Sequence, residues 1–287
     1  MKAPSKILLG LVTLFVVTEA HAMRWYSPTT GRWFSRDPIG EAGGKNLYSF
    51  VGNNAISRFD PFGLKDYRVG TDDPTITPDA GAGTWNSKPW ELGTWSLEQF
   101  IEANIGIIWI AMPDATAHLN HYFGNSGSDY TIRLQKMIDD VPSAKRVHNR
   151  EIALAQSFVE SLPDGKHKIT SGAPSGSADG AYNTTSENKN WYYAVGGYSA
   201  WGKGNAIVCK DEYTLEFEYK FYDRYNWDGG KSVTILGQTV TDQFMGEFHR
   251  QGLAKEFDMR GAVKKTFKWK KGQAPKVTDG WESESGR

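Results

Sequence analysis

Acidic, phenolic and amide side chains gather directly after a segment in which apolar and polar residues alternate. They are Asp223, Tyr225, Asn226 and Asp228. Carboxylates that lie close together can bind a divalent cation, and a phenol beside them can move a proton. The same residues, followed by Gly229 and Gly230, are also those of an ordinary turn at the end of a strand, and that interpretation stays open.

Further along the chain, His249 and Arg250 end a short helical pattern. They could return to the Asp223 segment as a base and a cation, although a histidine beside Phe248 is more often packed or exposed to solvent. His118 and His121 lie one helical turn apart, but no third metal ligand follows at a suitable spacing. The sequence therefore indicates one candidate site, centred on Asp223.

Strands must position the Asp223 segment, because apolar residues at every second position define one buried face from Tyr213 to Phe221. Other segments with strand character are 191–198, 204–208, 233–235 and 263–269.

Helices come mainly before these strands. We expect a buried helix that begins near Ser96 and runs through the apolar residues 107–112, a second over 113–123, and a third over 143–162. A short helix over Asp242–Arg250 lies between the later strands. The order predicts an α+β fold, with N-terminal helices packed on a mainly antiparallel sheet.

The composition excludes one broad class of partner. The chain has 287 residues with 33 basic and 33 acidic side chains, and a neutral chain argues against nucleic-acid binding. The one cysteine, Cys209, excludes an intrachain disulfide. The apolar run 107–112 and the lysines from 264 to 271 would suit contact with a membrane surface, but a buried helix and a solvated strand face explain them more simply.

The first 22 residues have the features of a secretory signal peptide. Lys2 and Lys6 precede an apolar run, and small residues favour cleavage after Ala22. The run is short for a membrane span. We therefore expect a secreted or periplasmic protein.

Residues 23–64 resemble the C-terminal end of an Rhs-repeat core. The resemblance lies in Arg24-Trp25-Tyr26, Gly31-Arg32-Trp33, Asn46-Leu47-Tyr48 and the two Asp-Pro-x-Gly turns that start at Asp37 and Asp60. In Rhs and polymorphic-toxin proteins this segment precedes a variable effector, and an aspartyl-protease-like centre cuts after the second turn. Self-cleavage here would use Asp37 and Asp60, but two ordinary turns are the favoured interpretation.

The expected organisation follows from this resemblance. It comprises a signal peptide (1–22), an Rhs-core segment (23–64), a linker (65–95), an effector domain (96–272) and a disordered C-terminal tail (273–287).

A second resemblance covers roughly residues 110–270, which are similar to the activity domain of colicin M-type bacteriocins. It is carried by His118–Gly127, by the strands within 196–222, by Tyr222–Trp227 and by the segment 250–259. The resemblance implies a Mg-dependent hydrolase that cuts lipid II, the lipid-linked peptidoglycan precursor, between its lipid and its pyrophosphate. It also implies an immunity protein as partner.

The residues match this family in part. Asp223 and Tyr225 occupy the first positions of its acidic motif, whereas Asn226 stands where the family has a second Asp, and the His that should follow is absent. Asp228 could replace the lost carboxylate, so that Mg would be held by Asp223 and Asp228, and His249 with Arg250 could complete the site. A non-catalytic envelope or interaction protein with a degenerate effector domain remains the alternative.

Overall fold

The computed structural model describes residues 26–27, 29–30, 32–34, 48, 58–59, 67–227, 229–230, 232–235 and 238–282. The expected signal peptide, the two turn residues Asp37 and Asp60, and Asp228 lie outside the described residues. None of the helices in the described ranges is both long enough and apolar enough to cross a membrane.

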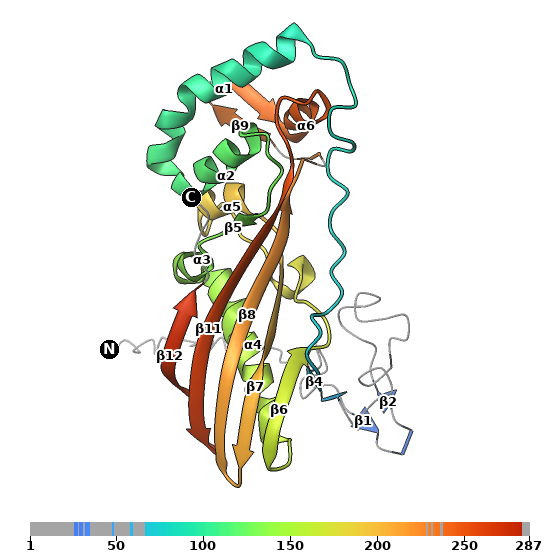
Figure 1. Cartoon of the computed structure of the whole chain (residues 1–287), viewed down its shortest axis with the longest axis vertical. Helices are drawn as coiled ribbons and strands as arrows, with labels where there is room; N and C mark the ends of the chain where they lie inside the picture. Colours follow the sequence, from blue (N-terminus) through green and yellow to red (C-terminus); the bar gives the residue numbers. More distant parts are fainter. Residues whose placement is uncertain are drawn as a thin grey trace, which may run out of the picture.

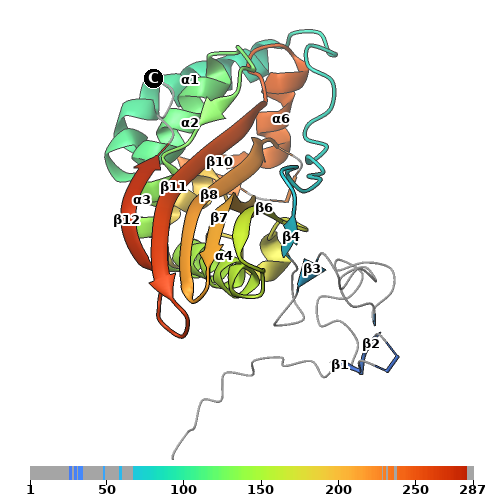
Figure 2. The same cartoon turned by 60° about the horizontal axis from the view of Figure 1, so that its bottom comes forward.

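One twisted sheet forms the centre of the protein (Figures 1 and 2). Seven strands lie side by side and pair antiparallel, and the short strand β5 (Tyr130–Thr131) adds to β11 in parallel. In spatial order the seven are β12 (Lys276–Glu282), β11 (Phe257–Lys270), β8 (Glu212–Tyr225), β7 (Ser199–Cys209), β6 (Gly165–Ser171), β4 (Tyr67–Val69) and β3 (Arg58–Phe59). The α+β class expected from the sequence is confirmed.

The strand β8 carries both the core and the candidate site. Its apolar residues from Tyr213 to Phe221 are buried at every second position, as the alternation predicts. All fourteen residues of β8 pair with β11, from Tyr225 opposite Phe257 to Glu212 opposite Lys270. Because successive side chains of a strand point to opposite faces of the sheet, this continuous pairing fixes which side chains of β8 point into the core.

Helices cover one face of the sheet and one end of it (Figures 1 and 2). The helix α4 packs against β4, β7 and β8, whereas α1, α2 and α6 gather at the end of the sheet where β8 stops. The helices are α1 (Leu92–Ala111), α2 (Pro113–Phe123), α3 (Leu134–Asp140), α4 (Pro142–Glu160), α5 (Lys189–Ala194) and α6 (Asp242–Arg250), with a short 3-10 turn η3 (Ser177–Asp179).

Two hairpins lie outside the main sheet. The strands β9 (Ser232–Ile235) and β10 (Gln238–Thr241) pair with each other between β8 and α6, and β1 (Tyr26–Ser27) pairs with β2 (Arg32–Trp33). An extended segment, residues 70–91, runs from β4 to α1 along one side of the sheet (Figure 1). We call this segment the strap.

A buried carboxylate connects α4 to the edge of the sheet. Glu151 is fully buried and accepts hydrogen bonds from the hydroxyl groups of Tyr67 (3.0 Å), Ser171 (3.1 Å) and Ser175 (2.8 Å). A buried charge is tolerated only when it is hydrogen-bonded in this way. The site therefore rests on a scaffold that is fixed by apolar packing and by this polar contact.

Several local predictions differ from the structure. Residues 189–194 form α5 instead of a strand, because the Asn188 side chain caps the helix by accepting the Trp191 N–H (3.1 Å) and Trp191 is fully buried. The helix α1 begins at Leu92, before the expected cap Ser96. Residues 276–282 form β12 where a disordered tail was expected, because they pair with β11. The expected linker contains β4, which pairs with β6.

Candidate functional site

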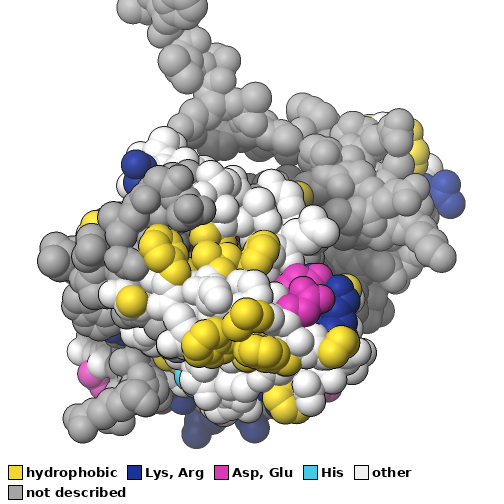
Figure 3. Space-filling model, turned by 90° about the horizontal axis from the view of Figure 1, so that it is seen from above, with side chains coloured by type: hydrophobic (Ala, Val, Ile, Leu, Met, Phe, Trp, Pro, Cys, Tyr) yellow, Lys and Arg dark blue, Asp and Glu magenta, His cyan; other side chains and the backbone are white. Residues whose placement is uncertain are grey.

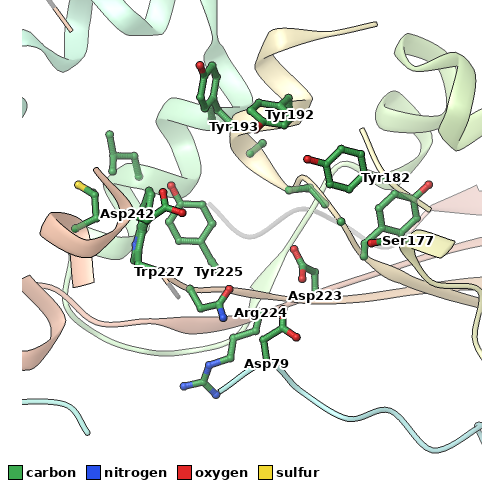
Figure 4. A pocket seen from close by; sticks show the side chains of 18 of the residues that line it. Asp79, Ser177, Tyr182, Tyr192, Tyr193, Asp223, Arg224, Tyr225, Trp227 and Asp242 are labelled. Carbon is green, nitrogen blue, oxygen red and sulfur yellow. The ribbon is translucent and has the colours of Figure 1, made fainter. Parts of the chain in front are cut away.

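A cavity of about 400 Å³ opens where β8 ends, between the sheet, α2, α5 and α6 (Figure 4). Its polar lining comes from elements that are far apart in the sequence. The acidic side chains are Asp79, Asp223 and Asp242, and the other polar and aromatic ones include Asn226, Arg224, Ser177, Tyr182, Tyr192, Tyr193, Tyr222, Tyr225 and Trp227.

Asp223 breaks the apolar face of β8. It follows Phe221 and precedes Tyr225 in the series of alternate residues that point toward the core, yet it is a carboxylate. A carboxylate inside an apolar core is costly, whereas one at the wall of a polar cavity keeps polar surroundings. Asp223 is partly exposed and lines the cavity, which explains why this position tolerates a charge.

Tyr225 continues the same face and is held rigidly. Its side chain is only 7% exposed, and its ring stacks on Phe257 with a centroid distance of 5.0 Å and an angle of 19°. Trp227 and His118 meet the ring edge-on. Burial raises the pKa of the Tyr225 phenol, and the negative charge of Asp242 raises it further. The phenol is therefore neutral and can act as a hydrogen-bond donor.

Asn226 and Trp227 leave the sheet just after β8. The backbone N–H of Trp227 donates to Glu256 Oε1 (2.9 Å), which holds the chain at the cavity wall. Asn226 Nδ2 and Trp227 Nε1 are both buried, and neither has a hydrogen-bond partner among the residues that the structure describes. Buried donors in native proteins are usually paired, so these two are exceptions at the cavity wall.

Asp242 reaches the cavity from the first turn of α6. The Thr241 hydroxyl caps this helix by accepting the Phe244 N–H (3.2 Å), and the Asp242 side chain is buried. Figure 4 shows the carboxyl group of Asp242 beside Tyr225 and Trp227, with Asp223 farther along the wall. An acidic side chain in the first turn of a helix stabilises that helix through the helix dipole.

His249 and Arg250 are not among the residues that line the cavity. His249 Nε2 donates to the Gly83 carbonyl (3.0 Å), while Nδ1 accepts the Glu256 N–H (3.1 Å). Arg250 donates to the carbonyl of Ala82 (2.9 Å) and is paired with Glu247 (2.8 Å). Both side chains therefore attach the strap to α6.

These attachments matter for the site because the strap contributes Thr77, Pro78 and Asp79 to the cavity wall. Glu256 takes part as well, since its Oε1 accepts the Ala82 N–H (2.8 Å) in addition to that of Trp227. One buried carboxylate thus holds the strap and the end of β8 together.

Tyr222 and Arg224 occupy the alternate positions of this stretch of β8. Both also contribute to the cavity wall, and both contact acidic residues on or beside the neighbouring strand β11. Arg224 lies 3.7 Å from Glu256 Oε2 and 3.8 Å from Asp258 Oδ1. Burial and the neighbouring Asp258 raise the pKa of Tyr222 to about 12. Figure 4 shows the Arg224 guanidinium directed away from Tyr225.

Both histidines of α2 contact backbone carbonyl groups. His118 Nδ1 lies 2.8 Å from the Ala194 carbonyl, and burial lowers the pKa of this imidazole to about 4. His121 Nε2 lies 2.9 Å from the Ser128 carbonyl. Within the described residues, no group of three or more His, Cys, Asp or Glu side chains is placed to hold a metal ion.

Of the residues proposed from the sequence, the structure brings together Asp223, Tyr225 and Asn226, whereas Asp228, Asp37 and Asp60 lie outside the described residues. Sequence reasoning did not single out Asp242, Asp79 or the tyrosines of α5. An acidic residue in the first turn of a helix was a signal for Asp242, but it is equally a helix-stabilising feature.

Comparisons with known proteins give one relation. A stretch of 44 residues is 46% identical to the toxin subunit YenC2 of Yersinia entomophaga, and 48% identical to the toxin subunit YenC1 of the same organism. Each match covers 15% of this chain and 4% of the relative. Over this stretch the chain is similar to toxin subunits. No protein-family model matches the chain, and no solved structure matches it.

The relation is compatible with a secreted protein. Because the chain spans only 4% of the length of these relatives, the matched stretch says nothing about the chemistry of the cavity. That chemistry is inferred below from the residues that line it.

Proposed function

We propose that this chain is a secreted Rhs-associated toxin whose effector domain hydrolyses a lipid-linked pyrophosphate, with lipid II of the periplasm as its substrate. In this reaction water provides the oxygen and protons, and the bond between the polyprenyl group and the pyrophosphate breaks. The products are free polyprenol and the pyrophosphorylated sugar-peptide.

The observation that carries the proposal is that Asp223, Tyr225 and Asn226 line one cavity of about 400 Å³. Within the segment Tyr222–Trp227, which resembles the colicin M motif, Asp223 and Tyr225 match the motif and Asn226 stands where the family has a second Asp. Tyr225 is neutral and rigid, so it can donate a hydrogen bond to a phosphate oxygen, and the buried Nδ2 of Asn226 can do the same.

Mg²⁺ fits the residues that are present. Magnesium is typically bound by one or two protein carboxylates, with waters and substrate phosphates as its other ligands. Asp223 lines the cavity and would hold the ion, whereas Asp228, the second carboxylate expected from the sequence, lies outside the described residues. When bound, Mg²⁺ would neutralise charge on the pyrophosphate oxygens. A site of this kind needs no cluster of three protein ligands, so the absence of one from the described ranges is compatible with it.

A surface at one end of the protein supports an approach to membranes. Trp85, Trp90, Leu92 and Trp95 are between 39% and 63% exposed. Figure 3, seen from the end that carries α1 and α6, shows hydrophobic side chains gathered on this face. Tryptophan suits the interface between water and lipid. The proposal therefore includes a membrane surface and, as for other toxins of this type, an immunity protein that blocks the cavity.

Incubation of the full chain with lipid II and Mg²⁺, followed by measurement of released polyprenol, tests the proposal. We expect release by the wild type and a loss on the order of 100-fold in Asp223→Asn, as when one group that stabilises developing charge is removed. Glu216→Gln is the matched control, because Glu216 lies on the same strand, is exposed and is not part of the cavity wall.

One observation favours the alternative of a non-catalytic interaction protein. His249 and Arg250 are engaged in contacts with the strap, so neither is placed to act in the cavity. If wild type and Asp223→Asn both release no polyprenol, and the chain directed to the periplasm is harmless, the hydrolase proposal is wrong and this alternative holds.

A further inference from the structure

The middle of the strap lies at the mouth of the cavity. Thr77, Pro78 and Asp79 belong to the cavity wall, and all three are exposed to solvent. A residue that lines a cavity and also faces solvent lies where the cavity opens. A molecule that enters or leaves the cavity at this edge must therefore pass the strap.

The strap is fixed to the rest of the protein on both sides of this stretch. Before it, Asp73 forms ion pairs with Lys203 (2.8 Å) and Lys220. After it, the Ala82 N–H donates to Glu256 Oε1 (2.8 Å). These contacts hold the two ends of the stretch to the sheet, so that a movement of the strap is confined to the residues between them.

Residues 75–79, between these two attachments, make few contacts. None of them takes part in a hydrogen bond or an ion pair within the part of the chain that the structure describes. Four of the five are exposed, and Ile76 is half-buried. Segments of this kind, with few contacts and an exposed backbone, open most readily in folded proteins.

An arginine of β8 lines the cavity on the same side. Figure 4 shows Arg224 and Asp79 together on the side of the cavity away from the tyrosines of α5. Arg224 lies 3.7 Å from Glu256 and 3.8 Å from Asp258, distances too long for hydrogen bonds. Its Nε is buried and has no partner among the described residues. Hydrogen-bond donors of Arg224 therefore remain available for a carboxylate.

The contacts of Glu256 show that Asp79 is within reach of this arginine. The Glu256 Oε2 atom that lies 3.7 Å from Arg224 Nη2 would also be overlapped by a Cβ added at Gly81. Gly81 and the arginine thus lie against one carboxylate. Asp79 precedes Gly81 by two residues, which span at most about 7 Å. A small movement of the strap could bring the two side chains together.

We propose that residues 75–79 form a gate over the cavity, and that the gate closes when Asp79 forms an ion pair with Arg224. The pair is not formed in this structure, which therefore represents the open gate. Closure of such a segment excludes water from a site and retains its ligand. The inference goes beyond the proposed function, because it does not depend on which ligand the cavity binds.

The alternative is that the strap is a fixed wall and that Asp79 and Arg224 are independent surface charges. The two possibilities differ in how solvent reaches the cavity. If the strap is a fixed wall, neutralising either charge leaves the access of a small reagent unchanged. If it is a gate, neutralising either charge favours the open state and increases the access.

The experiment measures how fast iodoacetamide, a small neutral reagent, labels a cysteine placed in the cavity of the full chain. The reporter is Ser199→Cys in a Cys209→Ser background, because Ser199 is half-buried and belongs to the cavity wall. The test variants are Asp79→Asn, Arg224→Gln and the double variant. Asp72→Asn is the matched control, because Asp72 is an exposed acid of the strap outside the cavity wall.

A second reporter measures effects that are unrelated to the cavity. The natural Cys209 is exposed and lies on the same strand, β7, as the cavity reporter. Its labelling rate in proteins that keep Ser199 should be the same with and without each substitution. Circular dichroism and the melting temperature establish that every variant is folded.

We expect Asp79→Asn and Arg224→Gln each to speed labelling of the cavity cysteine about two- to fivefold, the range for an exposed ion pair. The double variant should label no faster than the faster single variant, because both substitutions remove the same pair. Asp72→Asn should label like the unsubstituted reporter protein. A direct effect of charge on the thiol would instead have opposite signs in the two single variants.

Three results would overturn the inference. The first is an unchanged labelling rate in folded Asp79→Asn and Arg224→Gln proteins. The second is a change in opposite directions in these two variants. The third is a double variant in which the two accelerations multiply, because the two charges would then act independently. Lipid II hydrolysis is not part of this measurement, so the gate and the proposed substrate stand or fall separately.

Discussion

Two buried imidazoles should make the stability of the protein depend on pH between 7 and 5. Burial lowers the pKa of both His118 and His148 to about 4, from an ordinary value of 6.5. Between these values the unfolded chain binds more protons than the folded one, so stability falls as the pH falls through this window. With these pKa values, each histidine destabilises the fold by about 2 kcal/mol at pH 5 relative to pH 7, or about 4 kcal/mol together.

The surroundings explain why neither imidazole accepts a proton easily. Around His118, burial outweighs the Ala194 carbonyl and the nearby Asp114, both of which favour the charged form. Around His148, the positive charge of Lys265 adds to the effect of burial.

Asp73, a carboxylate with a lowered pKa, titrates outside this range. Burial alone would raise the pKa of Asp73, but hydrogen bonds from Lys203, Lys220 and Trp201 lower it to about 2. The stability that this depressed pKa contributes is lost only as the pH falls below about 4. The histidines can therefore be studied separately from it.

Urea unfolding followed by tryptophan fluorescence at pH 7 and pH 5 measures the effect in wild type, in His118→Asn, in His148→Asn and in the double variant. Asparagine keeps a donor near the position of Nδ1 but does not titrate. His167→Asn is the control, because its ring is partly exposed. Between pH 7 and pH 5, each single variant should lose about half as much free energy of unfolding as the wild type loses, and the double variant should lose little. A double variant that loses as much as the wild type would refute the assignment.

Four other substitutions, one of them a control, test the scaffold. Glu151→Ala should destabilise the protein by about 3 kcal/mol in urea unfolding, because three buried hydroxyl groups lose their acceptor; a loss below about 1 kcal/mol would contradict this. In Gly202→Ala the new methyl group would overlap the Tyr67 hydroxyl, which should lower the free energy of unfolding by about 1–3 kcal/mol. The control is Gly93→Ala, whose methyl group would contact no neighbour, so thermal unfolding should show an unchanged or raised stability. Arg250→Ala should speed hydrogen exchange in the strap but not in β7. If the strap exchanged at the same rate in the variant as in the wild type, other contacts would be holding it.

The sheet and the main helices could be predicted because their signals are local. The alternation from Tyr213 to Phe221 and the helical spacing over 143–162 reflect burial of one face, which the structure confirms in β8 and α4. The segment around Trp191 misled the prediction, because its aromatic residues suit a strand, while the deciding feature was a cap by Asn188.

The composition of the cavity was less accessible to sequence reasoning. Asp223 is visible in the sequence as the charged member of an apolar series, but Asp242 and Asp79 reach it only through tertiary contacts made by α6 and the strap. The partners of His249 and Arg250 on the strap also depend on the tertiary fold. Spacing along the chain does not encode such long-range placement.

The β9–β10 hairpin joins β8 to α6 along the chain and contributes Ser232 and Val240 to the cavity wall. Asp223 is placed by the pairing of β8 with β11, and Asp242 by the capped and anchored α6. Residues inserted into or deleted from this hairpin should therefore alter the rim of the cavity while both acidic groups stay in place. Two versions of this protein that differed only in the hairpin would thus differ in the opening of the cavity while they shared its floor.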